Sequence, residues 1–144
     1  ADADRDGAIS FAEAHWFAST EGDARNVTYT SIDALADDWF NAHPGSLPQS
    51  LAVKEILALA TSAPPAEARA LRSLLAGSSA DLALPLGDPA GSAMRWRPGS
   101  GLPRALAAQL TRRLIYLRDS GKPDPELARL QSCENRSVAA FLKP

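Results

Sequence analysis

The sequence contains very little cysteine. Its only cysteine among 144 residues is Cys133, so the chain cannot form an internal disulfide. A single thiol of this kind is most often buried in helical packing, and we expect this of Cys133. A thiol nucleophile also needs a neighbouring base, and neither His15 nor His43 lies in a recognisable cysteine-enzyme motif with it. Cysteine chemistry is therefore not predicted.

A strong charge of one sign and long apolar runs are also missing. The formal net charge is −2 and the isoelectric point is about 5.6, so nothing attracts the chain as a whole to nucleic acid or to anionic lipid. No run approaches the roughly 18 apolar residues of a membrane span. Neither a Gly-x-Ser-x-Gly elbow nor a glycine-rich phosphate loop occurs. With 45% hydrophobic residues, the sequence predicts one globular unit.

The most informative segment is the first. Residues 2–13 read Asp-Ala-Asp-Arg-Asp-Gly-Ala-Ile-Ser-Phe-Ala-Glu, with acids at loop positions 1, 3, 5 and 12 and glycine at position 6. This is the spacing of an EF-hand loop, which gathers about 6 to 8 oxygen ligands around Ca²⁺. The predicted ligands are Asp2, Asp4, Asp6, the carbonyl of Ala8, a water-mediated contact of Ser10, and both carboxylate oxygens of Glu13.

Two further residues of this loop have predicted structural roles. Gly7 should make a turn with positive φ, and Ile9 should point inward and pin the loop to a core. The alternative is an acidic tail ahead of a helix whose dipole favours aspartate. An ordinary EF-hand also has a helix before the loop, and only Ala1 precedes Asp2, so we expect a segment of a longer protein. A lone half-hand favours structural bracing over calcium sensing.

The remaining sequence predicts a mainly α fold, an irregular helical domain of five to seven helices within a single unit, 1–144. Periodicity and boundary residues predict helices at 10–20, 32–42, 48–63, 66–76, 102–120, 125–133 and 138–142. Residues 1–20 would form the calcium loop and its exit helix. The proline- and glycine-rich stretch 77–101 would be an irregular connector with up to two short strands. Residues 27–30 suggest another extended segment.

Several side chains have predicted environments. Phe11, Ala14, and Phe17 or Ala18 stand at helical spacing, which predicts that the exit helix continues directly from the loop. On the longest helix, leucines predict the core face, and we expect the arginines to lie on a solvated face: Arg104, Arg112, Arg113 and Arg118. His15 is expected to be a surface or packing residue. Ser31 should cap the helix that ends at His43, which can meet the helix dipole.

A candidate partner contact lies within the connector. Arg95, Trp96 and Arg97 follow one another between turn signals, and arginine and tryptophan are enriched at interface hot spots. Ordinary packing of Trp96 is the alternative interpretation.

The first 44 residues also carry a family resemblance. The calcium loop, continued by Ala-His and followed by Val-Thr-Tyr-Thr-Ser-Ile-Asp-Ala-Leu-Ala-Asp, resembles the stretch after the catalytic core in some bacterial caspase-like or legumain-like cysteine peptidases. In that family the catalytic His and Cys lie upstream, and no matching motif occurs here, so no catalytic residue is assigned. The resemblance implies a C-terminal piece whose calcium loop braces a helical appendage against a peptidase core.

The sequence thus favours a calcium-binding, non-catalytic helical domain with a structural or regulatory role, whose partner is the rest of its own protein or another chain. One alternative is a processed subunit of a cysteine peptidase. Another is an adaptor that binds a protein through the loop around Trp96. The heavy use of Ala, Arg and Leu is typical of a GC-rich bacterial source, and a calcium loop slightly favours a periplasmic or secreted location.

Overall fold

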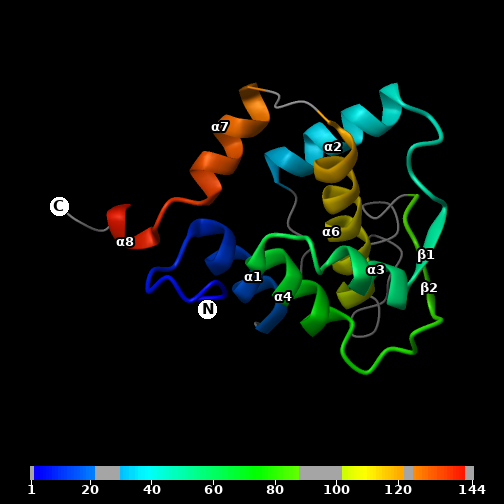
Figure 1. Ribbon diagram of the computed structural model, residues 1–144, viewed down its shortest axis with the longest axis horizontal. Helices are drawn as coiled ribbons and strands as arrows, with labels where there is room; N and C mark the ends of the chain where they lie inside the picture. The colour runs from blue at the N-terminus through cyan, green and yellow to red at the C-terminus, as the bar shows by residue number, and fades with distance from the viewer. Residues whose placement is uncertain (1, 22–29, 88–101, 122–124, 142–144) are drawn as a thin grey trace.

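The fold is mainly helical, as the sequence predicted. The computed structural model describes residues 2–21, 30–87, 102–121 and 125–141, and these contain seven helices and one two-stranded sheet (Figure 1). The elements in chain order are α1 (Phe11–Glu21), α2 (Ser31–Ala42), β1 (Ser50–Ala52), α3 (Val53–Leu59), α4 (Pro65–Leu74), β2 (Ala83–Pro85), α6 (Leu102–Asp119), α7 (Pro125–Glu134) and α8 (Val138–Phe141).

The predicted start of the third helix was wrong. Residues 50–52 form β1 and pair antiparallel with β2, with Leu51 opposite Leu84, so α3 begins at Val53. The strand β2 lies within the predicted connector. Leu84 and Leu86 are buried on alternate positions there, which confirms one short strand in this stretch. Pairing with this distant strand overrides the helical signal of 48–52.

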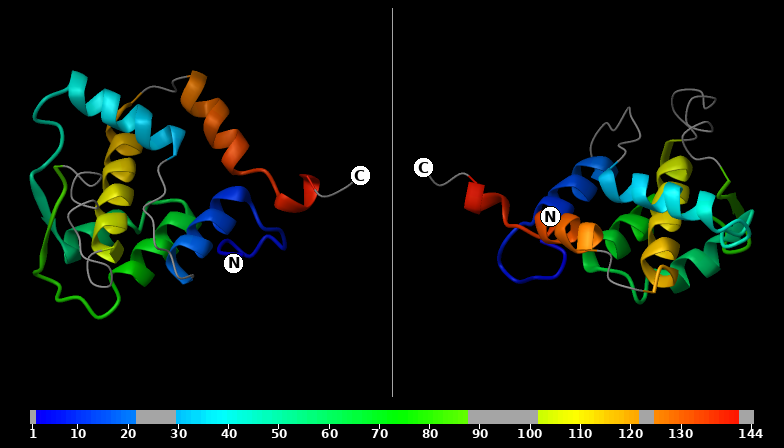
Figure 2. Two further views of the ribbon diagram at one scale, coloured as in Figure 1. Left: turned by 180° about the vertical axis from the view of Figure 1, so that it is seen from behind. Right: turned by 90° about the horizontal axis from the view of Figure 1, so that it is seen from above.

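Helix α6 is the centre of the molecule, with α2, α3 and α4 packed around it (Figures 1 and 2). Every residue from Ala105 to Tyr116 is buried. The predicted solvated arginine face was therefore wrong for two of its four members, because Arg112 is 9% exposed and Arg113 only 2%. Arg104 and Arg118 are exposed, as expected.

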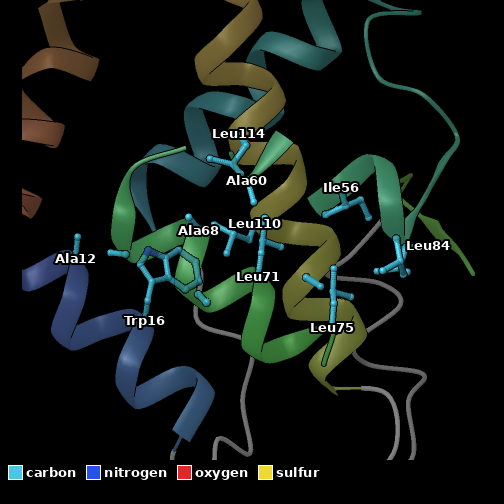
Figure 3. Close-up of a cluster of buried hydrophobic side chains, with 14 residues drawn as sticks. Ala12, Trp16, Ile56, Ala60, Ala68, Leu71, Leu75, Leu84, Leu110 and Leu114 are labelled. Atoms are coloured by element: carbon cyan, nitrogen blue, oxygen red, sulfur yellow. The ribbon is translucent and has the colours of Figure 1, made fainter. Parts of the chain in front are cut away.

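Two hydrophobic clusters share α6. The first joins α1, α3, α4 and one side of α6, with Trp16, Ile56, Leu71 and Leu110 at its centre (Figure 3). The second joins α2 and α7 to another side of α6; its buried members are Ile32, Ala36, Phe40, Leu86, Ala108, Ile115, Tyr116 and Leu127. Because both sides of α6 are covered by apolar side chains, its polar residues must find partners inside the protein.

The buried face of α1 does not carry its two phenylalanines. Ala12, Trp16 and Ser19 are buried at helical spacing, whereas Phe11 and Phe17 are 38% and 41% exposed. Packing of α1 against α4 selects the face that carries the larger indole ring. Ile9 is 40% exposed, so the expectation that it pins the loop to the core was wrong.

Helix ends and the lone thiol complete the comparison. The N-cap of α2 is Thr30 rather than Ser31, and Asp33 completes a capping box with it. His43 ends α2 as predicted, with its Nδ1 2.8 Å from the carbonyl oxygen of Trp39.

Cys133 is exposed on α7, which contradicts the expected burial. Within the described residues, no helix is both long and apolar enough to cross a membrane.

Candidate metal centre

The chain from Asp2 to Ser10 folds back on itself and leads directly into α1. Gly7 has φ +86°, which confirms the predicted turn with positive φ, and a Cβ added there would meet no atom within 4 Å. Arg5 also has positive φ, at 63°. Two left-handed residues so close together curl the loop toward its own carboxylates.

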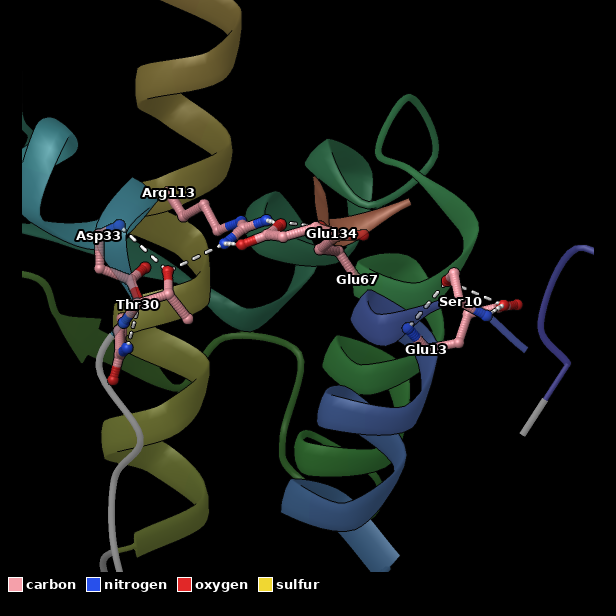
Figure 4. Close-up of polar contacts among 8 residues, drawn as sticks. Ser10, Glu13, Thr30, Asp33, Glu67, Arg113 and Glu134 are labelled. Carbon is pink, nitrogen blue, oxygen red and sulfur yellow. Dashed lines mark hydrogen bonds and ion pairs between the residues drawn. The ribbon is translucent and has the colours of Figure 1, made fainter. Parts of the chain in front are cut away.

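Glu13 holds the two ends of the loop together (Figure 4). Its Oε1 accepts hydrogen bonds from the N–H of Ala3 at 2.6 Å and of Asp4 at 3.4 Å. Its Oε2 accepts from both the N–H and the hydroxyl of Ser10, at 2.9 and 3.0 Å, and the Glu13 N–H donates to Ser10 Oγ. Burial raises the pKa of Glu13, but the hydrogen bonds from Ser10, Ala3 and Asp4 outweigh it, so the pKa lies below its ordinary value.

The three aspartates each use one oxygen to hold the loop backbone. Asp2 Oδ2 accepts from the N–H of Gly7 at 3.1 Å, Asp4 Oδ1 from that of Asp6 at 3.1 Å, and Asp6 Oδ1 from that of Ala8 at 2.8 Å. The second oxygen of Asp2, Oδ1, is buried and has no hydrogen-bond partner. A buried carboxylate oxygen without a donor is costly, and a cation beside it would supply the interaction that it lacks.

Three of the predicted ligands converge. Asp2, Asp4 and Glu13 each offer a carboxylate oxygen, and these atoms lie within 4.8 Å of one another. Asp6 is not a member of this group. The hydroxyl of Ser10 donates to Glu13, and its contact through water remains a prediction. The carbonyl of Ala8 remains a predicted ligand.

The donor set fits a hard divalent cation. Every side-chain donor in the group is a carboxylate oxygen, the chemistry that Ca²⁺ prefers over nitrogen or sulfur. No ion pair among the described residues reaches these carboxylates. Like charges gathered without a cation repel one another. The loop also forms an isolated antiparallel bridge, between Ser10 and Ser137, with the segment that joins α7 to α8.

A second charged cluster, which the sequence analysis missed, lies inside the protein. The guanidinium of Arg113 on α6 contacts Glu67 of α4 at 3.2 Å, and both carboxylate oxygens of Glu134 on α7 (Figure 4). Its Nη1 also donates to Thr30 Oγ1 at 3.2 Å. The Glu67 and Arg113 side chains are 4% and 2% exposed. One arginine thus joins α2, α4, α6 and α7.

Burial dominates the electrostatics of this cluster. It raises the pKa of Glu67, while the charge of Arg113 acts in the opposite direction. Burial lowers the pKa of Arg113, but the hydrogen bond and charge of Glu134 and the charge of Glu67 outweigh it and leave the pKa raised. The available sequence signal was the continuous run of apolar and small residues on both sides of the arginines, which is typical of a helix buried all round.

The neighbouring Arg112 has a separate role. It donates to the carbonyl oxygen of Leu86 at 2.8 Å, pairs with Asp37 of α2, and lies 5.2 Å from the ring centroid of Phe40. These contacts tie the end of β2 to α2 across α6. Both buried arginines therefore act as cross-links between elements.

A cavity lies between α1 and two residues that contact Arg113. Its volume is about 260 Å³, and its lining includes His15, Trp16, Thr30 and Glu134. His15 Nε2 is buried without a hydrogen-bond partner. Burial lowers the pKa of His15 and the charge of Arg113 lowers it further, whereas Glu134 and Asp33 raise it, and the net shift is downward. His15 is thus a packing residue, one of its two expected roles.

The last predicted contact is the partner contact around Trp96. Arg95, Trp96 and Arg97 fall outside the residues that the structure describes.

Comparisons with protein-family models, with curated proteins and with solved structures found no match to this chain. The functional argument therefore rests on the residues themselves.

Proposed function

We propose that this chain is a calcium-binding, non-catalytic helical domain, and that Ca²⁺ at residues 2–13 has a structural or regulatory role in a larger protein. The observation that carries this proposal is the convergence of Asp2, Asp4 and Glu13, together with the buried Oδ1 of Asp2 that has no hydrogen-bond partner. The spacing of an EF-hand loop supplies the identity of the cation. Bound Ca²⁺ would supply the positive charge that no described side chain provides.

The residues of the loop explain how binding would brace the domain. Glu13 is the third residue of α1 and also the residue that closes the loop. Its carboxylate therefore couples the loop to the direction of α1. Because Ala12 and Trp16 of the same helix lie in the core, a loop held in place by its carboxylates would hold α1 against α4.

The test is calorimetric titration of the 144-residue chain with Ca²⁺, using a matched pair of variants. Glu55 has the same place in α3 that Glu13 has in α1, and its Oε2 likewise accepts a backbone N–H at the helix start, from Ala52 at 2.8 Å. Glu55→Gln therefore controls for the lost cap. We expect one calcium site in the wild type and in Glu55→Gln, and no heat in the same range for Glu13→Gln. A flat wild-type titration, or equal binding by Glu13→Gln, would overturn the proposal.

Association with a caspase-like or legumain-like peptidase rests on the resemblance of residues 1–44 alone. The adaptor role of Trp96 and a periplasmic or secreted location likewise rest on the sequence. All three remain predictions.

A further inference from the structure

The backbone between Ile9 and Phe11 has two edges with different partners. On one edge, the carbonyl of Ile9 accepts from the N–H of Val138 at 2.8 Å, and the N–H of Phe11 donates to the carbonyl of Arg136 at 3.0 Å. The N–H of Ser10 lies on the other edge, which faces the loop, and donates to Glu13 Oε2. This alternation is the ordinary geometry of an extended strand. The same three residues therefore serve the loop and a second segment at once.

We propose that residues 136–138 are the intramolecular docking partner of the calcium loop, so that cation binding and docking of the α7–α8 segment stabilise each other. This inference rests on the calcium binding proposed above. Two segments far apart in the sequence meet here: the loop and α8 lie side by side at one end of the molecule, opposite the sheet (Figures 1 and 2).

The coupling follows from what the bridge requires. Its bonds form only if the backbone from the carbonyl of Ile9 to the N–H of Phe11 is held in place, and Glu13 holds it through Ser10. A loop whose carboxylates repel one another holds this strand less firmly than a loop whose charges are balanced. Energetic coupling is reciprocal, so a docked segment that favours the extended strand must also favour cation binding.

The segment has few other attachments. Beyond α7, residues 139 and 140 are exposed and Val138 is half-buried. Upstream, α7 is held by the buried Leu127 and by the contact of Glu134 with Arg113. The bridge is thus the main described link between residues 136–140 and the rest of the chain, and its loss should free these residues without unfolding the core.

The deciding variant is Val138→Pro, with Val138→Ala as its matched control. Proline removes the N–H that Ile9 accepts, yet it is tolerated at the first residue of a helix, and it favours an extended conformation at Ser137, as the bridge requires. Alanine keeps the N–H. Amide hydrogen exchange followed by NMR then reports the bridge through Phe11, with the Leu86 amide in the distant sheet as reference for global unfolding.

We expect calcium to slow exchange at Phe11 more than at Leu86 in the wild type and in Val138→Ala, and not in Val138→Pro. Calorimetry should show calcium affinity about two- to tenfold weaker in Val138→Pro than in Val138→Ala, the range of one net hydrogen bond. Calcium binding with no selective slowing at Phe11, and equal affinity in both variants, would overturn the coupling alone. Absence of calcium heat in the wild type would overturn the proposed function and this inference together.

Discussion

Two groups of carboxylates in this protein are balanced in different ways. Glu67 and Glu134 surround the guanidinium of Arg113 in the interior, so their charges are compensated by a residue of the same chain. Asp2, Asp4 and Glu13 gather at one end of the molecule, and no ion pair to a described side chain compensates them. The first group has a counter-charge within the fold, whereas the described side chains supply none to the second.

The two groups of carboxylates also connect helices in different ways. Arg113 links four helices through direct contacts, so the connection exists whenever the chain is folded. The loop links α1 to the segment beyond α7 through backbone bonds whose geometry depends on its carboxylates. We therefore expect the interior link to set the baseline stability, and the loop to make part of that stability depend on calcium.

The largest effect should follow from breaking the interior cluster. Arg113→Met leaves Glu67 buried without its partner, which should lower the free energy of unfolding by about 3 to 5 kcal/mol in urea titrations followed by circular dichroism. Adding Glu67→Gln should recover part of the loss, because the uncompensated charge is then removed. The control is Arg118→Met, whose exposed pair with Asp119 should contribute at most about 1 kcal/mol. Equal effects of the two arginine variants would contradict the comparison.

Calcium should change stability by a smaller and adjustable amount. At a free concentration about one hundred times Kd, a ligand that binds only the folded state adds about 2.7 kcal/mol to the free energy of unfolding. A chelator should remove this gain from the wild type and from Glu55→Gln. Glu13→Gln and Asp2→Asn should show no gain to remove. A gain that survives both loop substitutions would place the cation elsewhere.

Thr30 is both the N-cap of α2 and a contact of Arg113. Its hydroxyl accepts from the N–H of Asp33 and from Arg113, so Thr30→Ala should cost about 1 to 2 kcal/mol of unfolding free energy. Thr30→Ser keeps the oxygen and should restore most of the loss. Ser31→Ala, at the residue first predicted as the cap, should change stability by no more than about 0.5 kcal/mol. Thermal unfolding of the three variants measures these losses of stability and shows which is largest.

His15 should give the smallest effect, and it appears only on acidification. Burial holds its folded-state pKa below the ordinary value of 6.5, so the unfolded chain binds a proton more readily. The corresponding stability is present above pH 6.5 and is lost as pH falls from there toward the lower folded-state pKa. The unfolding midpoint of the wild type should therefore fall more steeply between about pH 7 and 5 than that of His15→Gln. Parallel curves would contradict this assignment.

Most helices could be predicted because their signals are local. Pro65 at the start of α4 and Gly121 with φ +64° after α6 mark boundaries that hold in the structure. The start of α3 could not be predicted, since it depends on pairing with residues 83–85. The environment of Arg113 had only an indirect signal, the run of apolar and small residues around it, because the periodicity of one helix does not show that packing covers a second face of α6.

By itself, the sequence determined the turn at Gly7 and the spacing of the carboxylates that meet in the loop, because the hydrogen bonds of their side chains join residues at most ten positions apart. Only the tertiary structure decided which carboxylates pair with a buried arginine. It also decided which segment forms the bridge with the loop. Those decisions join residues that are distant in the sequence, such as Thr30 and Arg113, and Phe11 and Arg136. Local backbone geometry specifies the first kind of contact, whereas the second depends on how whole helices pack.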